Sequence, residues 1–340
     1  MLYRRAMFGA QYRHPTFGVL ESLSAASVRR SGPRIVALGG GTGLASLLRG
    51  LKEHTENITA VVTTADDGGS SGRLREELEI PPPGDARQCL IALSDSEPLM
   101  EELLSYRFES GAALGGHSFG NLLLAALSHT QGSFHEALQG AASLLAVRGQ
   151  VVPAALGSDI QLQARTGGGK ILEGESSIGK AGEPIADLWI VPSDPHVNPA
   201  VIQAIDEADL IVIGPGSLYT SILPNFLVPG ISGAVASSSV PKILVCNVAT
   251  QHGETDGMSA SDHLDVFRRH TSLEITHFLV NGRPLPIADH FHQTPLTTGT
   301  SIPGFSGGLV LRDLVSEIQT SRHDPQKLAK AVLSINRTRG

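Results

Sequence analysis

Two segments near the start of the chain carry residue types suited to binding phosphate and metal. A glycine turn follows the apolar run 34–38, and the acid pair Asp66 and Asp67 follows the apolar run 58–64. Glycines let the backbone approach an anion, whose charge the free N–H groups of a following helix can hold. A carboxylate pair suits a hard cation bridging protein and phosphate oxygens, so Mg²⁺ is the candidate cofactor. The sequence predicts a metal-assisted nucleotide site, with Asp66 and Asp67 as metal ligands and Gly40, Gly41, Thr42 and Gly43 as ligand-binding residues.

The loop after the acid pair offers further groups for a phosphate. Backbone N–H groups, hydroxyls and a guanidinium occur together in Gly69, Ser70, Ser71 and Arg73, and such groups bind anions. In an alternative interpretation, Asp66 and Asp67 bind a ribose hydroxyl, as the acidic residue of a Rossmann site does. Both interpretations place the two acids next to a nucleotide. The chain has Leu44 where a dinucleotide fingerprint needs glycine, so NAD is not an expected cofactor.

The segment Gly116–Gly120 matches the nucleophile elbow of hydrolases. An elbow must follow a β-strand, whereas a loop of small residues precedes this segment, so we do not expect a hydrolase. We interpret the segment as a helix start, and a plain N-cap serine is the competing structural role. In the functional interpretation three polar side chains turn toward the ligand: His117, Ser118 and Asn121.

A triple-proline segment leads into another expected helix near Asp85. Asp85 is the expected cap of that helix. The alternative, in which Asp85 or Arg87 reaches the same cleft, stays open.

Two further polar loops follow apolar runs in the second half of the chain. In an open α/β sheet, ligands lie beyond the carboxyl ends of the strands. These loops should therefore converge with the two earlier segments on one sheet edge. The ligand-binding candidates in them are Gly214, Gly216, Ser217, Tyr219, Thr220, Asn247, Thr250, Gln251, Glu254 and Thr255.

The elements that must position these loops alternate between strand and helix. The apolar runs 34–38 and 58–64 are typical of strands covered on both faces of a parallel sheet. The fold class predicted is α/β, with a doubly wound, mostly parallel sheet in a Rossmann-like three-layer α/β/α arrangement. Further strands are expected at 210–213, 242–248 and 277–280, and helices at 86–94, 97–106, 119–129, 134–145, 197–207, 261–270 and 325–335.

The interval 147–193 breaks this alternation. Its short apolar segments, beginning with Val151–Val152, are separated by glycine-rich turns and predict a small β-rich insertion with an antiparallel meander. We expect the nucleotide-binding domain over 33–320 and a C-terminal helix and tail over 321–340. Residues 1–32 are rich in arginine and are interpreted as a disordered or atypical N-terminal extension, with a transit peptide as the alternative.

Composition excludes several classes of function. The 340-residue chain has a net charge of −7 and only 4% aromatic residues, so no nucleic-acid partner is expected. The two cysteines, Cys89 and Cys246, are far apart, and no Cys/His spacing suits a metal, so neither zinc nor haem is an expected cofactor. Isolated cysteines fit the reducing cytoplasm. No apolar window is long enough for membrane insertion.

The ordered series of motifs resembles the gluconeogenesis factor family (YvcK) over about residues 33–320. That family is similar to the 2-phospho-L-lactate transferases (CofD), which move a phospholactyl group from a guanosine diphosphate donor to a deazaflavin in a magnesium-dependent reaction. One departure is His252, which occupies a position where the family has proline. The motifs that carry the resemblance are Gly39–Leu44, Ala65–Arg73, Pro81–Asp85, Gly116–Asn121, Gly214–Ser221 and Thr250–Gly257.

The resemblance implies a cytoplasmic bacterial protein that binds a UDP-sugar, such as UDP-N-acetylglucosamine or UDP-glucose. It implies a regulatory role in cell shape and wall synthesis during gluconeogenic growth, a homodimer, and a regulatory protein partner. No catalytic residue is assigned by it. The alternative function is a Mg-dependent transferase of the 2-phospho-L-lactate transferase type, acting on a nucleotide-diphosphate-linked donor.

Overall fold

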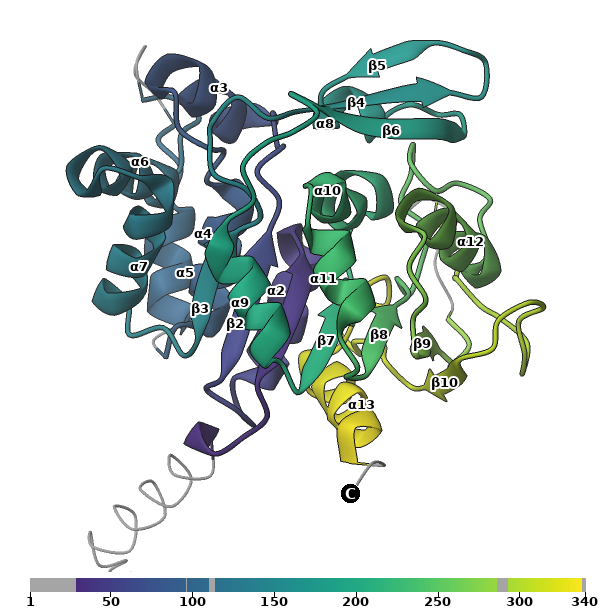
Figure 1. Ribbon diagram of the computed structural model, residues 1–340. Helices are drawn as coiled ribbons and strands as arrows, with labels where there is room; N and C mark the ends of the chain where they lie inside the picture. Colours follow the sequence, from purple (N-terminus) through teal and green to yellow (C-terminus); the bar gives the residue numbers. More distant parts are fainter. Residues whose placement is uncertain (1–28, 96, 110–113, 286–292, 338–340) are drawn as a thin grey trace, which may run out of the picture.

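The computed structural model describes residues 29–95, 97–109, 114–285 and 293–337 (Figure 1). The predicted N-terminal extension lies outside the described residues up to residue 28, as does the end of the predicted C-terminal tail from residue 338.

A seven-stranded parallel sheet forms the centre of the molecule, with strand order β10-β9-β8-β7-β1-β2-β3. The chain leaves β1 to form β2 on one side and later returns to form β7 on the other. The boundary between β1 and β7 is therefore the point where strand order reverses, which is where open α/β sheets bind ligands. The strands are β1 (Ile35–Gly39), β2 (Ile58–Val62), β3 (Gln150–Pro153), β7 (Leu210–Ile213), β8 (Lys242–Val245), β9 (His277–Asn281) and β10 (Gly308–Arg312).

Helices cover both faces of this sheet (Figure 1). Every residue of β1 is buried, and alternate side chains enter different cores: Ile35 and Ala37 on one face, Val36 and Leu38 on the other. This confirms the predicted doubly wound α/β class. The Ile35 face packs α2 (Gly41–Leu51), α4 (Gly84–Leu93), α6 (Phe119–Gln131), α7 (Phe134–Leu144) and α13 (Pro325–Arg337), and the Val36 face packs α9 (Pro199–Glu207), α10 (Leu223–Leu227), α11 (Ile231–Ser237) and α12 (Ala260–Thr271).

A separate three-stranded antiparallel sheet has the order β5-β4-β6. Figure 1 shows it beyond the carboxyl ends of the main strands, above α10. The short helix α8 (Glu175–Ile178) joins its strands, which are β4 (Gln161–Thr166), β5 (Ile171–Glu173) and β6 (Ile185–Val191).

The first segment of the predicted meander is wrong, because Val151–Val152 lies in β3 of the main sheet. Residue 151 pairs with Ala60 in a parallel register. Its side chain enters one core, while that of Val152 enters the other. Burial on both faces is the pattern of a strand in the main sheet, so the antiparallel region begins only at Gln161.

Each helix and strand predicted from the apolar pattern is present within a few residues of its expected ends. The sequence analysis missed six elements: α3 (Gly69–Leu78), α8, the π-helix η1 (Leu218–Ile222), α10, α11 and β10. Helix α5 (Glu97–Ser105) packs beside α4 and α6. The residues after the acid pair, expected as a loop, are thus the first turn of α3.

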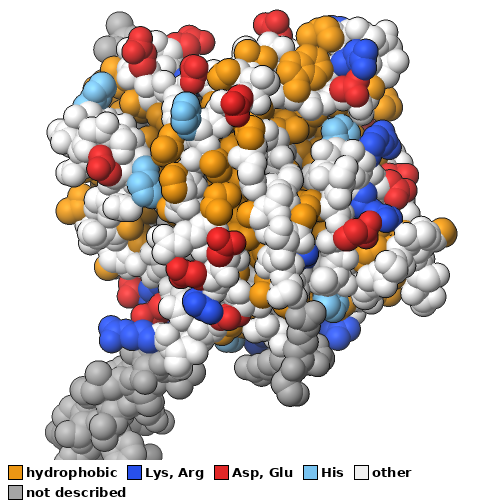
Figure 2. Space-filling model, in the orientation of Figure 1, with side chains coloured by type: hydrophobic (Ala, Val, Ile, Leu, Met, Phe, Trp, Pro, Cys, Tyr) orange, Lys and Arg blue, Asp and Glu red, His pale blue; other side chains and the backbone are white. Residues whose placement is uncertain are grey.

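The outer surface mixes charges of both signs. Figure 2 shows acidic and basic side chains interspersed over one face of the molecule. Within the described residues, no single helix is long and apolar enough to cross a membrane; the pair Leu218–Leu227 and Ile231–Ser237, bent by 82°, passes that test together by length and composition alone.

Candidate functional site

A cavity of about 410 Å³ opens at the carboxyl ends of β1, β7 and β8. It therefore lies at the point where strand order reverses. The predicted ligand-binding residues that line it are Gly40, Gly41, Thr42, Gly43, Gly216, Ser217, Thr220, Asn247, Thr250 and Gln251. The predicted residues that do not line it are Asp66, Asp67, Gly69, Ser70, Ser71, Arg73, His117, Ser118, Asn121, Gly214, Tyr219, Glu254 and Thr255.

The N-terminus of α2 faces this cavity without a side-chain cap. Its N-cap residue is Gly40, which has no side chain, and Gly41 has a φ of +61°, in the left-handed region that favours glycine. A methyl group at Gly43 would lie 2.6 Å from the carbonyl oxygen of Pro215, so only glycine allows the two loops to approach. The N–H groups of an uncapped first turn suit an anion.

The loop after β7 is held in place by Asn247, which follows β8. The Asn247 Nδ2 donates to the Gly216 carbonyl at 2.7 Å, and the Gly216 N–H donates to Asn247 Oδ1 at 3.1 Å. Both polar ends of this amide are therefore engaged. Asn247 shapes the cavity by fixing the loop rather than by offering free groups.

The residues behind the β7 loop support the wall of the cavity. Glu254 is buried and accepts hydrogen bonds from Ser217 Oγ at 2.5 Å and from the Tyr219 N–H at 2.7 Å. Burial raises the pKa of the Glu254 carboxyl. Thr255 Oγ1 accepts from the Gln251 N–H at 2.8 Å. Glu254 therefore connects the β8 loop to the β7 loop, and Thr255 stabilises the β8 loop, without either residue lining the cavity.

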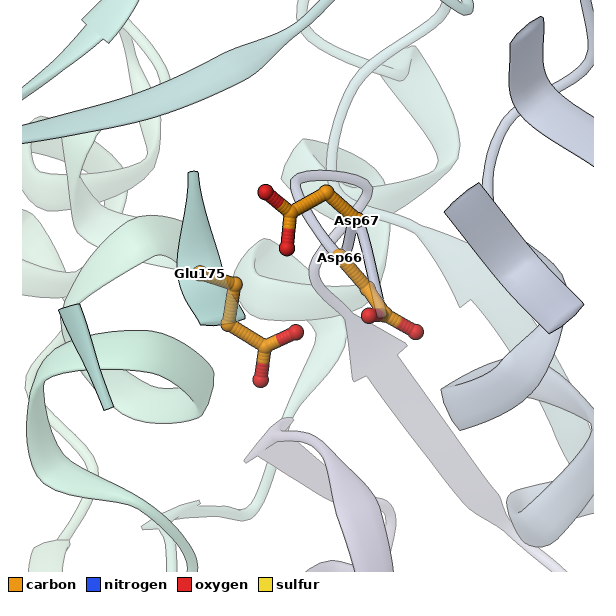
Figure 3. A group of neighbouring side chains, drawn as sticks. All are labelled: Asp66, Asp67 and Glu175. Atoms are coloured by element: carbon orange, nitrogen blue, oxygen red, sulfur yellow. The ribbon is translucent and has the colours of Figure 1, made fainter. Parts of the chain in front are cut away.

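Three carboxylates meet at the β2 end of the cavity (Figure 3). One oxygen from each of Asp66, Asp67 and Glu175 lies within 4.8 Å of the others. Glu175 also lines the cavity, so it connects the acid group to the glycine loops. Burial and the neighbouring Asp66 raise the pKa of Glu175, which shows the repulsion that a cation would relieve. An all-oxygen donor set fits Mg²⁺.

Local hydrogen bonds aim the two aspartates. The Gly68 N–H donates to Asp66 Oδ1 at 2.7 Å, which closes a tight turn after β2. The Ser176 N–H, at the start of α8, donates to Asp67 Oδ1 at 2.8 Å. The small sheet therefore supplies one acid, Glu175, and orients another. No pattern in the sequence marks Glu175, because this residue follows a short strand in the insertion and not a strand of the main sheet.

Asp85 does not cap its helix, so that prediction is wrong. The N-cap of α4 is Pro83, and Asp85 lies in the first turn, where its buried carboxylate accepts from the Gly41 N–H and lines the cavity. Proline has no side-chain acceptor, and the glycine turn offers an unpaired donor instead. Burial and the charge of Asp66 raise the pKa of Asp85 to about 7. The alternative prediction, that Asp85 reaches the cleft, is confirmed.

A second polar cluster lies between α3, α4 and α6, outside the cavity. Ser70 Oγ is 3.0 Å from His117 Nδ1 and accepts from Asn121 Nδ2 at 3.1 Å, while Arg87 Nε donates to Asn121 Oδ1 at 3.0 Å. Ser118 is the N-cap of α6, and its hydroxyl accepts a hydrogen bond from the Asn121 N–H. Its role is therefore that of a plain helix cap, as in the competing structural interpretation. These groups saturate one another and join three helices.

The turn before α13 adds cavity residues that the sequence analysis missed: Ser321, Arg322 and His323. His323 Nε2 donates to the Cys246 carbonyl at 3.1 Å. Burial lowers the pKa of His323 to about 4, so its ring is neutral. No glycine turn or polar strand end marks this segment, and only its packing against the end of β8 brings it to the site.

Comparison with known proteins identifies the class. A sequence model of 2-phospho-L-lactate transferase CofD matches residues 35–294. The gluconeogenesis factor of Halalkalibacterium halodurans is 53% identical over 315 residues, covering 88% of this chain and 95% of the relative. That of Bacillus subtilis is 50% identical over 255 residues, covering 75% and 80%. A crystal structure of a UPF0052 family member from Bacillus halodurans is 46% identical with a TM-score of 0.83, covering 89% of this chain and 99% of that one.

The fold and the matched model define a CofD-like α/β protein. Within that class, the chain belongs to the gluconeogenesis factor family (YvcK, UPF0052). The family resemblance drawn from the sequence motifs is confirmed.

Proposed function

We propose that the cavity binds a UDP-sugar, such as UDP-N-acetylglucosamine or UDP-glucose, and that the protein acts in the cytoplasm as a regulatory gluconeogenesis factor. The observation that carries this proposal is the uncapped N-terminus of α2 inside a polar cavity at the point where strand order reverses. The names of the relatives support the designation gluconeogenesis factor. Cell shape and wall synthesis under gluconeogenic growth are the processes it would serve.

In this proposal the diphosphate lies between the first turn of α2 and the loop at Gly216. Backbone N–H groups and the hydroxyl of Ser221 are the available donors. Asp66, Asp67 and Glu175 would hold Mg²⁺, which would neutralise their charge and that of the diphosphate. The cation therefore explains how acids and an anionic ligand share one cavity.

Isothermal titration calorimetry with UDP-N-acetylglucosamine and Mg²⁺ tests the proposal. The unmodified protein should bind, and Gly43→Ala should lose most of the affinity because the added methyl group meets the β7 loop. Gly140→Ala is the matched control, because Gly140 also lies within a helix and a methyl group there meets no atom within 4 Å. Absence of binding at millimolar ligand by folded protein would overturn the proposal.

A second candidate function is a Mg-dependent transferase of the 2-phospho-L-lactate transferase type. The observation that favours it is the acid group at one end of the cavity, beside the proposed diphosphate position. A cation there would stabilise charge on a diphosphate leaving group. Incubation with nucleotide-diphosphate-linked donors and Mg²⁺ tests it. A product that disappears in Asp67→Asn would support the transferase, whereas binding without any product would exclude it for those donors.

We also propose a homodimer and a regulatory protein partner, on the family resemblance alone. Light scattering after size-exclusion chromatography measures the first directly, and a mass of one chain at micromolar concentration would contradict it. Pull-down with and without UDP-N-acetylglucosamine tests the second. A regulatory partner should show a preference for one of the two states.

A further inference from the structure

A second pocket, of about 370 Å³, lies between the β8 loop, α12 and the start of β6, and shares no lining residue with the cavity at the strand ends. We call it the α12 pocket; its lining is drawn from residues 182–185, 253–258 and 262–269, together with Tyr219. In Figure 1, α12 lies below the small sheet. The Gly182 N–H donates to the Gly253 carbonyl at 2.9 Å, which ties the insertion to the β8 loop beside this pocket. The volume falls in the lower part of the range for small-molecule sites, about 300–1,000 Å³.

Acidic side chains dominate the lining of the α12 pocket. Asp256 lies 3.1 Å from His252 Nδ1, an ion pair only when that ring is protonated. Glu183 and Asp265 make no hydrogen bond or ion pair with any other described residue. A cleft lined by charges of one sign attracts and concentrates counter-ions. The charged lining residues are the acids Glu183, Glu254, Asp256, Asp262 and Asp265 and the base Arg269.

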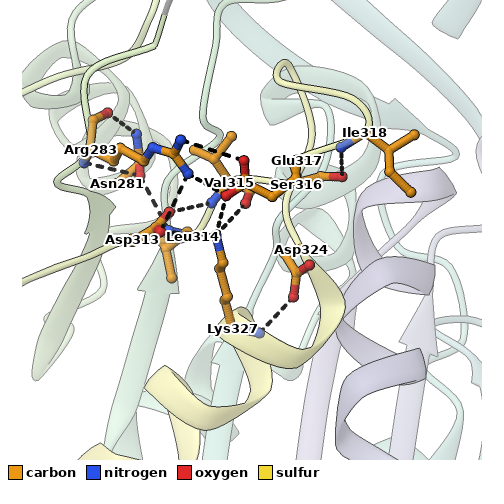
Figure 4. Close-up of polar contacts among 10 residues, drawn as sticks. All are labelled: Asn281, Arg283, Asp313, Leu314, Val315, Ser316, Glu317, Ile318, Asp324 and Lys327. Atoms are coloured by element: carbon orange, nitrogen blue, oxygen red, sulfur yellow. Dashed lines mark hydrogen bonds and ion pairs between the residues drawn. The ribbon is translucent and has the colours of Figure 1, made fainter.

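The surface network of Arg283, Asp313, Glu317 and Lys327 shows what a balanced group of charges looks like in this chain (Figure 4). Arg283 and Lys327 each pair with both Asp313 and Glu317, so two bases neutralise two acids and the segment between β10 and α13 is held. In the α12 pocket, Arg269 is the sole base among the described lining residues. The acids of this pocket therefore lack the cationic partners that the surface network has.

Glu254 provides an independent indication of a missing cationic partner. Only 5% of this residue is exposed, and its Oε2 is buried without a hydrogen-bond partner among the described residues. Its Oε1, in contrast, accepts from Ser217 Oγ and from the Tyr219 N–H. A buried carboxylate oxygen without a partner is costly. Because the β7 loop engages Oε1, Oε2 is the oxygen left for a group bound in the α12 pocket, which Glu254 lines.

The distribution of these acids favours an extended organic cation over a metal ion. Among the described residues, three acidic ligand atoms within 4.8 Å of one another occur only in the acid group of the cavity, so the acids of the α12 pocket do not converge on one point. Apolar side chains lie between them, from Ile185, Met258 and Val266. An alkyl chain can cover such apolar groups while its ammonium ends meet the carboxylates.

We propose that the α12 pocket binds a linear alkyl polyamine, with one ammonium group on Glu254 Oε2 and another on exposed acids such as Asp265. We further propose that the polyamine tightens ligand binding in the cavity. Glu254 holds Ser217, which lines the cavity, and Tyr219, which lines the α12 pocket. A cation on Oε2 keeps the carboxylate ionised and so strengthens its hold on the β7 loop. Polyamine binding stands alone, whereas the coupling rests on the proposed function.

Isothermal titration calorimetry with spermidine, at physiological ionic strength and with Mg²⁺ present, tests the site. The unmodified protein should bind spermidine. Glu254→Gln keeps an acceptor for Ser217 and the Tyr219 N–H but removes the charge, and should weaken binding about tenfold or more, as expected for a charged hydrogen bond. Asp265→Asn, at an exposed position, should weaken it a few fold. Glu317→Gln is the matched control, because it removes the same charge from the surface network and should change nothing.

Equal spermidine affinities in all these proteins would mean unspecific attraction to an acidic chain and would overturn the site. Loss of binding in Asp67→Asn instead would place spermidine on the acid group of the cavity and would also overturn it. If Glu254→Gln does not fold, Asp265→Asn decides, since unchanged affinity there contradicts the proposal.

The coupling is measured by repeating the spermidine titration with saturating UDP-N-acetylglucosamine, which should raise spermidine affinity about fivefold or more, because coupling between two sites is reciprocal. Unchanged spermidine affinity would overturn the coupling and leave the polyamine site intact. Failure of the protein to bind UDP-N-acetylglucosamine would overturn the proposed function, whereas the spermidine result would still decide the α12 pocket.

Discussion

The cavity at the strand ends and the polar cluster between α3, α4 and α6 both arise from glycine-bounded polar segments, yet they differ in what they leave free. At the start of α2, Gly40 offers no cap; the Gly41 N–H donates to Asp85, and the N–H groups that follow it in the first turn stay available. At the start of α6, Ser118 caps the helix, and Asn121 bonds Ser70 and Arg87. Similar residue types therefore build a ligand site in one place and a structural joint in the other.

The difference follows from position relative to the main sheet. Loops after β1, β7 and β8 leave a common edge around a cavity, so some of their polar groups face open space. The second cluster is enclosed by three helices, and enclosed polar groups must satisfy one another. Substitutions in the helix cluster should therefore lower stability with little effect on ligand affinity, whereas substitutions in the cavity loops should lower ligand affinity.

The largest effect on stability is expected from Asn121→Ala in the helix cluster. The change removes partners of both Arg87 and Ser70 in a buried setting. We expect the free energy of unfolding to fall by about 2–4 kcal/mol, the range for a broken buried network that includes a charge. Urea unfolding measures this, and UDP affinity of the folded variant should stay within twofold. A selective loss of affinity with unchanged stability would mean that the cluster is a ligand site.

Two buried histidines, His263 on α12 and His323 at the cavity, should each favour unfolding in acid, whereas the raised pKa values of the Asp85 and Glu175 carboxyls act in the opposite direction. Desolvation lowers the pKa of each to about 4. An unfolded chain takes up these protons near pH 6.5, so the stability is full above that pH and is lost as the pH falls toward 4. Each histidine should remove about 2 kcal/mol between pH 7 and pH 5.

Measurements with and without ligand should distinguish the contributions of the two histidines. Chemical denaturation at a series of pH values, with His263→Gln and His323→Gln, assigns the slope to each residue. Saturating UDP should change the part that depends on His323, because this residue lines the cavity. The part that depends on His263 should stay unchanged. A slope of stability against pH between 7 and 5 that neither substitution changes would contradict the burial of both neutral rings.

An intermediate effect is expected from Asn247→Ala, which frees the β7 loop. The loss of two hydrogen bonds to Gly216 should lower the free energy of unfolding by about 1–2 kcal/mol. Because the loop forms a cavity wall, UDP affinity should fall about tenfold or more, in contrast to Asn121→Ala. Retained affinity in a destabilised Asn247→Ala protein would place the ligand away from this loop.

The smallest effect on stability is expected from Lys327→Ala at the surface network. Its ion pairs with Asp313 and Glu317 are exposed, so solvent screens them and the urea midpoint should hardly move. The turn at residues 321–323 should nevertheless be held less firmly, which predicts a loss of UDP affinity of a few fold. High salt should reproduce this loss in the unmodified protein and have less effect in the variant.

Sequence reasoning recovered what local patterns encode. Continuous apolar runs such as 34–38 and 210–213 identify strands buried on both faces, and the strand-end rule brings Gly41 and Gly216 to one cavity. Val151 was misplaced because a short apolar segment next to turns has the same composition in either sheet. Its register with β2 becomes visible only in three dimensions.

The missing site residues have a different physical origin. Glu175 reaches the acid group from the small sheet, and His323 reaches the cavity from the turn before α13. Neither follows a strand of the main sheet, so no periodicity or motif marks it. Asp85 was assigned as a cap because helix starts favour aspartate, yet the unpaired Gly41 N–H supplied a stronger partner.

A crystal structure of the protein soaked with UDP-N-acetylglucosamine and Mg²⁺ would test the central claim most directly. The account predicts diphosphate density between the first turn of α2 and Gly216, and a cation among Asp66, Asp67 and Glu175. Diphosphate density at Ser70, His117 and Asn121, or outside the cavity altogether, would contradict it.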